Sequence, residues 1–167
     1  PFERLLKGED AKQASKLENQ INELRTAEDY AGTIPLAEDL LALRTKVQGI
    51  DHWETVNAIW ALDTNRTVAA LSTHQRAAWR KAKEARAQAK KLEYRGQVAE
   101  AEPLNREYLH WCREVLGEMH PETARCYNNL ALNLHDQDKN IDARRLFQTS
   151  LLLRQKLLED KHPETAG

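Results

Sequence analysis

The phrase HPETA occurs twice in this chain, at residues 120–124 and 162–166, and the two copies begin 42 residues apart. A divergent copy, HWETV, lies at residues 52–56. A phrase that recurs along a chain is the signature of a repeat architecture, in which each unit packs mainly on its neighbours. The repeats therefore restrict the chain to folds built from stacked copies of one unit. They also direct the search for function toward a surface rather than toward a single catalytic centre.

The composition favours helices throughout. Of the 167 residues, 41% are hydrophobic and 31% are charged, with only 6 Gly and 5 Pro. This balance is too apolar for a disordered chain and too poor in turn residues for an all-β fold. Apolar residues such as Leu104, Leu109 and Cys112 recur at helical intervals before each repeated phrase. The sequence therefore predicts an all-α fold. It contains no apolar run long enough for a transmembrane helix, and we expect no signal peptide at its start.

Pairs of alanines mark where two helices approach each other. Ala89 and Ala101 lie 12 residues apart, and Ala131 and Ala143 repeat that spacing. Small side chains at these positions let the two helices of a hairpin pack closely, while larger neighbours fill the flanks. Each repeat is therefore predicted to be a pair of antiparallel helices.

These pairs accompany the phrases NNLA at residues 128–131, EAEPL at 100–104 and LGEMHPETA at 116–124. Together they resemble the tetratricopeptide repeat, in the 42-residue form that occurs in kinesin light chains and in bacterial multi-repeat proteins. The resemblance covers roughly residues 9–56 and 73–167. It implies a right-handed α-solenoid of antiparallel helix pairs that binds other proteins. Because the chain begins at Pro1 without Met and ends just after a repeat opens, we expect it to be a segment of a longer array.

One interval does not fit the period. His52 and His120 lie 68 residues apart, which is 26 more than one repeat. Ser72 and Gln75 form a capping-box pattern, so we expect one helix from about residue 53 to 70 and a long helix from there to about residue 94. We thus predict a single array over residues 1–167, with one extra helix in the middle. Its parts would be a repeat at 9–52, the extra helix at 53–71, repeats at 72–120 and 121–162, and the start of a further repeat at 163–167.

The charge is unevenly distributed. Residues 1–63 carry 12 acids and 7 bases, residues 64–95 carry 2 acids and 9 bases, and residues 96–167 carry 12 acids and 9 bases. A basic helix over residues 76–95 therefore lies between two acidic segments. This helix is either a solvated face that pairs with acidic neighbours or a cationic surface that attracts an acidic ligand.

The resemblance suggests where a ligand would bind, because the first helix of each pair lines the inner groove in this family. The alignment assigns eight residues on two such helices to the groove: Lys83, Arg86, Lys90, Glu93, Arg125, Asn128, Leu132 and His135. Asn129, next to Asn128, is a further candidate that either joins the groove or faces the neighbouring repeat. Asn128 is the strongest candidate, since its amide can both donate and accept a hydrogen bond and can therefore pair with a peptide backbone. The cations among these residues would attract an extended acidic peptide or a free carboxylate.

The histidines of the repeated phrases are predicted to be structural. His52, His120 and His162 would each cap the following helix, with Pro121 at the first helical position of its helix. A metal site would need them within bonding distance of one ion, and one histidine per repeat places them on separate turns.

Cysteines and tryptophans give no sign of a reactive site. Cys112 and Cys126 lack a metal-ligand spacing, so we expect reduced structural thiols, which is typical of a cytoplasmic protein. The four tryptophans are predicted to pack in the core. The sequence contains no glycine-rich phosphate loop, nucleophile elbow or HExxH motif. It therefore predicts a protein that is not an enzyme and needs no cofactor and no metal.

The sequence thus predicts a non-catalytic interaction scaffold whose partner is a protein or peptide segment, an acidic one or another domain of the same parent chain, and not a membrane. Two alternatives remain. One is an architectural spacer or self-association module, because the open ends of an array expose apolar faces. The other is binding of nucleic acid through the basic helix at 76–95, which the acidic flanks oppose.

Overall fold

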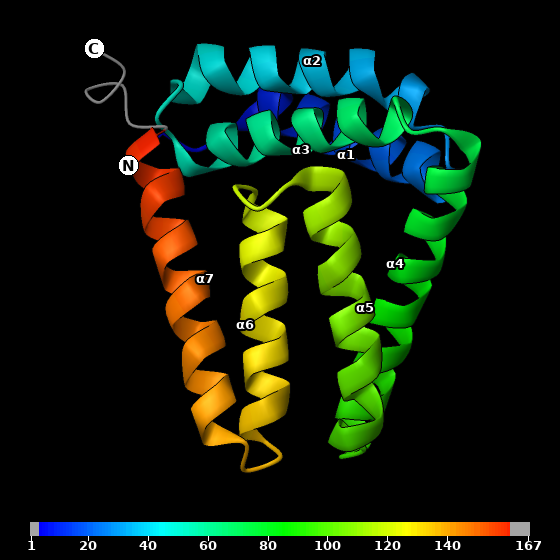
Figure 1. Ribbon diagram of the computed structural model, residues 1–167. Coiled ribbons are helices and arrows are strands. Elements are labelled where there is room, and N and C mark those ends of the chain that lie inside the picture. Colours follow the sequence, from blue (N-terminus) through cyan, green and yellow to red (C-terminus); the bar gives the residue numbers. More distant parts are fainter. Residues whose placement is uncertain (1–3, 161–167) are drawn as a thin grey trace. The chain divides into compact units, whose positions relative to one another are not determined.

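The computed structural model describes residues 4–160, which form seven α-helices and contain no strand (Figure 1). The predicted all-α class is therefore confirmed. The helices are α1 Gly8–Thr26, α2 Tyr30–Gln48, α3 Trp53–Ala69, α4 Thr73–Tyr94, α5 Val98–Leu116, α6 Pro121–His135 and α7 Asn140–Asp160. They fall into two compact units, residues 4–70 and residues 71–160. The phrase at residues 162–166, with His162, lies outside the described residues.

The first unit contains α1, α2 and α3, and α2 packs against both of the others. Its core is formed by apolar side chains of all three helices. These are Ala14, Leu17, Ile21, Ala37, Leu40 and Leu62. The buried residues of α1 recur at helical intervals and form one apolar stripe, whereas those of α2 also include Thr33, Arg44 and Gln48.

The second unit contains α4 to α7, in which each helix packs against the next one along the chain (Figure 1). Ala89, Ala101 and Ala131 are 0% exposed and Ala143 is 2% exposed. The alanine pairs therefore lie in the interior of the α4–α5 and α6–α7 hairpins, as the sequence predicts.

The repeated phrase lies where one helix ends and the next begins. Before it, α5 ends at Gly117, whose φ of 85° is a left-handed conformation that favours glycine. His120 then accepts a hydrogen bond at Nδ1 from the backbone N–H of Glu122, at 3.0 Å, and Pro121 opens α6. His52 does the same for Glu54, at 3.3 Å. The predicted capping role is confirmed for both histidines.

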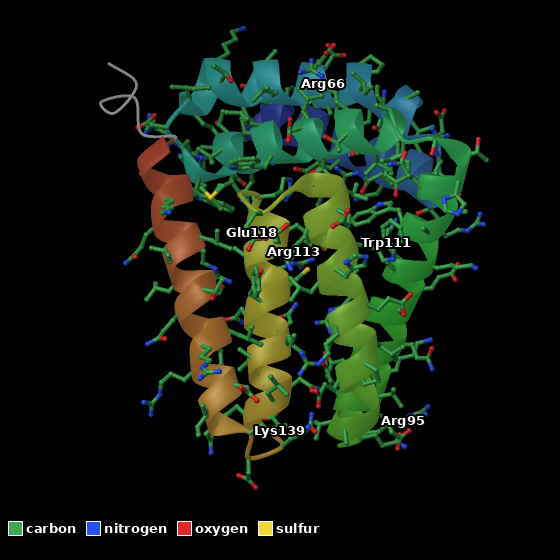
Figure 2. The ribbon with its side chains drawn as sticks, viewed as in Figure 1. Arg66, Arg95, Trp111, Arg113, Glu118 and Lys139 are labelled. Atoms are coloured by element: carbon green, nitrogen blue, oxygen red, sulfur yellow. The ribbon has the colours of Figure 1, made fainter. Side chains whose placement is uncertain are left out.

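An ion pair stabilises the link between α5 and α6. Arg113 Nε of α5 lies 2.7 Å from the Glu118 carboxylate, and Figure 2 labels both residues beside the α5–α6 link. Thr123 adds a hydrogen bond from its hydroxyl to the backbone carbonyl of Gly117, at 2.7 Å. The link therefore has a fixed conformation rather than being a loose connection.

The predicted interruption near residue 71 is present. Ser72 caps α4 through a full capping box with Gln75, and α3 and α4 begin and end close to the expected residues. The arrangement of all helices in one continuous array, with α3 as an inserted helix, stays a prediction.

The tryptophans do not behave alike. Trp79 is 4% exposed and stacks on Tyr108 of α5, with ring centroids 6.0 Å apart. Trp53 is 53% exposed, so its prediction as a core residue is wrong. Its position explains the exposure, because it is the first residue of α3 and its side chain has no preceding turn to pack on.

Among the described residues, no helix combines the length and the apolarity needed to span a membrane.

Candidate peptide-binding surfaces

The residues predicted to line a groove all lie in the second unit. Lys83, Arg86, Lys90 and Glu93 belong to α4, and the other five belong to α6. Helix α5 packs closely against both α4 and α6. On α6, the predicted residues 125, 128, 132 and 135 follow the helical period and share one face.

Arg86 is held by other side chains of its unit. Its Nη1 donates to Asn105 Oδ1 at 2.8 Å and to Glu93 Oε2 at 3.2 Å. Asn105 in turn donates through Nδ2 to Glu93 Oε1 at 2.7 Å, and it is 3% exposed. This triangle joins α4 to α5, so the guanidinium stabilises the hairpin and its charge is largely compensated.

Arg125 and Lys90 also have partners. Arg125 Nη2 donates to Glu122 Oε1 at 2.6 Å, and this hydrogen bond raises the pKa of Arg125 above its ordinary value. Lys90 Nζ lies 5.9 Å from the centre of the Tyr94 ring, within range of a cation–π contact. The predicted surface is therefore less cationic than its sequence indicates.

The remaining predicted residues differ in exposure. Asn128 and Asn129 are half-buried, whereas Leu132 is 46% exposed. His135 is exposed and its Nδ1 lies 2.8 Å from Asn140 Oδ1, the first residue of α7. His135 also lines a shallow hollow with Phe147 and Leu151 of α7, so it lies beside the second helix of its hairpin.

A second candidate site lies in the first unit. A cleft of about 400 Å³ is bordered by side chains of all three helices. They are Glu18, Ile21, Asn22 and Arg25 of α1, Ala37, Leu40 and Arg44 of α2, and Trp53, Glu54, Asn57, Ala58 and Ala61 of α3. We refer to it below as the α1–α3 cleft.

Arg44 is the central charged group of the α1–α3 cleft. It is 8% exposed, and its guanidinium contacts the carboxylates of Glu18 at 2.5 Å and Glu54 at 3.3 Å. Burial opposes ionisation of Glu54, but hydrogen bonds from Gln48 and Arg44 lower its pKa below the ordinary value. The Nε atom of Arg44 is buried and has no hydrogen-bond partner among the described residues.

Arg25 is a second cation in the same cleft, and it is incompletely compensated. Its Nε donates to Asn65 Oδ1 at 2.9 Å, and burial lowers the pKa of Arg25, with only partial compensation from Tyr30. The Asn65 Nδ2 atom is buried without a partner among the described residues. Arg25 and Arg44 line the cleft and their guanidinium groups are donors only, whereas Asn65 is 0% exposed and is not part of the cleft lining. A ligand rich in carbonyl or carboxylate oxygens would complement the two guanidinium groups.

Apolar and amide groups complete the α1–α3 cleft. The exposed Trp53 ring borders it, and the exposed amides of Asn22 and Asn57 belong to its two outer helices. The alignment of the repeats that assigns Arg86 and Asn128 to the groove also aligns Glu18 with them, so it could have pointed to this cleft. The sequence gives no comparable signal for the residues of α2 and α3. It suggests that Arg44 is an ordinary surface residue and that Trp53 is a core residue.

Comparison with known protein families identifies one repeat. Residues 123–164 match the sequence model of the tetratricopeptide repeat family, over a span that contains most of α6 and all of α7. The match supports a tetratricopeptide-type protein. No curated protein sequence matches the chain.

Proposed function

We propose that this tetratricopeptide-type chain is a non-catalytic scaffold for protein–protein interaction, and that it binds an extended peptide segment in the α1–α3 cleft. Tetratricopeptide repeats in general mediate contacts between proteins. The observation that carries the proposal is the composition of the cleft, which combines an exposed Trp53, apolar side chains and the partly desolvated Arg25. Aromatic and arginine side chains of this kind are the ones that dominate binding energies at protein interfaces.

The chemistry of the cleft indicates the kind of peptide. Arg25 and Arg44 offer donors, so the ligand would contribute acceptors from its backbone carbonyls or from a carboxylate. Ile21, Leu40 and Ala58 provide an apolar patch for one side chain of the peptide. Glu18 and Glu54 balance the arginines, so a single carboxylate facing Arg25 fits better than a densely acidic segment.

The test uses an array of short peptides that vary in charge and in apolar content, followed by fluorescence anisotropy with the peptides that bind. Trp53→Ala is expected to weaken binding by about 30-fold, as for an aromatic side chain that contributes strongly to an interface. Asn22→Ala should also weaken it, whereas Asn19→Ala, one turn earlier on α1 and outside the cleft, should not. If no peptide binds, the proposed function is wrong.

The same peptides separate the two candidate surfaces. The double variant Arg125→Ala with Asn128→Ala changes the face of α6 and leaves the first unit intact. Loss of binding in this variant, with normal binding in Trp53→Ala, would move the site to α6 and refute the assignment of the α1–α3 cleft. A fall in affinity with rising salt would support a carboxylate in the ligand.

Self-association is a second candidate, because α7 exposes several apolar side chains. Ile141 is 75% exposed, Leu151 is 58% exposed and Leu152 is 52% exposed. Such groups gathered on one helix favour contact with another apolar surface. Sedimentation velocity over a dilution series would detect the association, and Leu151→Glu should abolish it; a monomer at all concentrations would exclude it.

We also propose the more specific features that the sequence predicts for this protein. They are the 42-residue kinesin-light-chain-like subtype, a bacterial multi-repeat context, a cytoplasmic location and partner domains in the same parent chain. Binding of nucleic acid through the basic helix at 76–95 stays the weaker alternative, because Glu93 compensates the charge of Arg86.

A further inference from the structure

Two thiols and a carboxylate meet inside the second unit. Cys112 of α5 and Cys126 of α6 are 0% and 3% exposed, and their Sγ atoms lie 3.0 Å apart. One carboxylate oxygen of Glu122, in the first turn of α6, completes a group whose ligand atoms all lie within 4.8 Å of one another. We refer to these three residues as the thiol cluster.

The surroundings of Glu122 leave part of its carboxylate available. Its Oε1 accepts hydrogen bonds from the Tyr108 hydroxyl at 2.8 Å and from Arg125 Nη2 at 2.6 Å. In the part of the chain that the structure describes, Oε2 accepts no hydrogen bond. Tyr108 and Arg125 therefore orient the carboxylate, as the outer partners of metal-binding carboxylates do.

We propose that the thiol cluster is a binding site for a thiophilic divalent cation of the Zn²⁺ type, with Cys112, Cys126 and Glu122 as its protein ligands. Two thiolates and one carboxylate form a ligand set that suits Zn²⁺, and sites with three protein ligands keep a fourth position open. On binding, the two thiols release two protons to solvent. The three anionic ligands are then balanced by the divalent cation together with the neighbouring Arg125.

The distances are compatible with such an ion. With Zn–S bonds of about 2.3 Å and a tetrahedral angle, two sulfurs lie about 3.8 Å apart. The thiols must therefore separate by less than 1 Å, roughly, from their present 3.0 Å. Side-chain rotation on two adjacent helices can supply this change without moving the backbone.

Oxidation to a disulfide is the competing outcome for the same two thiols. It needs one thiolate as the attacking group. The Glu122 carboxylate beside the two thiols supplies a third ligand to a bound cation, whereas it contributes nothing to a disulfide.

The experiment titrates the reduced, metal-free full chain with Co²⁺ and then with Zn²⁺. We expect one Co²⁺ per chain at micromolar affinity, a sulfur-to-cobalt charge-transfer absorption in the near ultraviolet, and loss of that absorption when Zn²⁺ displaces Co²⁺. Cys112→Ser and Cys126→Ser should each lose most of the absorption. Glu122→Gln should keep it with at least about 10-fold weaker binding.

Glu118→Gln is the matched control. Glu118 also pairs with an arginine, Arg113, and accepts a hydrogen bond from a tyrosine hydroxyl, that of Tyr127, but it is not part of the thiol cluster. Its replacement should leave metal binding unchanged. Wild-type protein that binds neither ion at micromolar concentration, or that shows no sulfur-to-cobalt absorption, overturns the proposal whether or not the variants fold. So does a chain that mass spectrometry finds two hydrogens lighter, as the disulfide, under mildly reducing conditions.

Discussion

His120 allows the contribution of the repeated phrase to be measured. The side chain is 3% exposed, and its Nδ1 accepts the backbone N–H of Glu122 at 3.0 Å. His120→Ala removes this cap, which is worth about 1 kcal/mol. It also removes a buried ring, and the lost burial adds about 1 kcal/mol more. We therefore expect the free energy of unfolding to fall by about 2 kcal/mol and Tm to fall by roughly 4–8 °C.

His120→Asn separates the two contributions. Asparagine is among the best N-cap residues, so it restores the hydrogen bond to the first turn of α6 but not the packing of the ring. We expect it to recover about 1 kcal/mol of the loss. Guanidinium denaturation followed by circular dichroism measures both variants, and an unchanged slope of the transition shows that the comparison is valid.

The equivalent change at His52 is the internal comparison. His52 is 1% exposed and caps α3, but its hydrogen bond to Glu54 N is longer, at 3.3 Å. His52→Asn should therefore recover less relative to His52→Ala than the corresponding pair at His120. Equal destabilisation by Ala and Asn at residue 120 would show that the cap contributes nothing. An Ala variant as stable as the wild type would refute the structural role of the phrase.

Two further predictions concern packing and pH in the second unit. Ala131 is 0% exposed, so Ala131→Leu should lower the free energy of unfolding by about 1–3 kcal/mol through overpacking. Ala99→Leu, on the exposed face of α5, is the control and should be neutral. Equal urea midpoints for the two variants would contradict this prediction. Hydrogen bonds from Lys139, at 2.6 Å, and Arg106 hold the pKa of Glu102 at about 2 against burial, below its ordinary 4.5. Because this folded-state pKa is depressed, the stabilisation is full above pH 4.5 and is lost as the pH falls toward 2. After solvent screening it amounts to about 1–2 kcal/mol, and Glu102→Gln should remove that part of the acid dependence; an unchanged pH profile in urea titrations would contradict the assignment.

The sequence predicts those parts of the fold that depend on neighbours along the chain. A cap, a capping box or a glycine with positive φ acts within a few residues, so the ends of α4, α5 and α6 follow from Ser72, Gly117 and His120. The alanine pairs also succeed, because a hairpin brings residues at equal distances from its turn to the same level. This explains why the all-α class and the helix pairs are predicted well.

The candidate site is predicted less well, because it depends on where long side chains end. Arg86 reads as a free cation in the sequence, yet it meets Asn105, 19 residues away on α5. Arg44 reaches Glu18 across 26 residues and closes one part of the α1–α3 cleft. No local pattern specifies such partners, so sequence-based counting of charges overestimates how cationic a surface is.

The contact between the two cysteines of the thiol cluster, by contrast, could have been predicted from the sequence. Cys112 and Cys126 stand at equal distances from residue 119, in the link between α5 and α6. Ala89 and Ala101 are likewise centred on residue 95, and Ala131 and Ala143 on residue 137, each in the turn of its hairpin. Spacing rules for metal ligands assume that both cysteines lie in one loop, so they rejected a pair 14 residues apart. Two antiparallel helices convert that long interval into a direct contact. Symmetry about a predicted turn is therefore the appropriate search for metal-binding or redox pairs in helical hairpins, and the same rule locates both the alanines that pack and the thiols that meet.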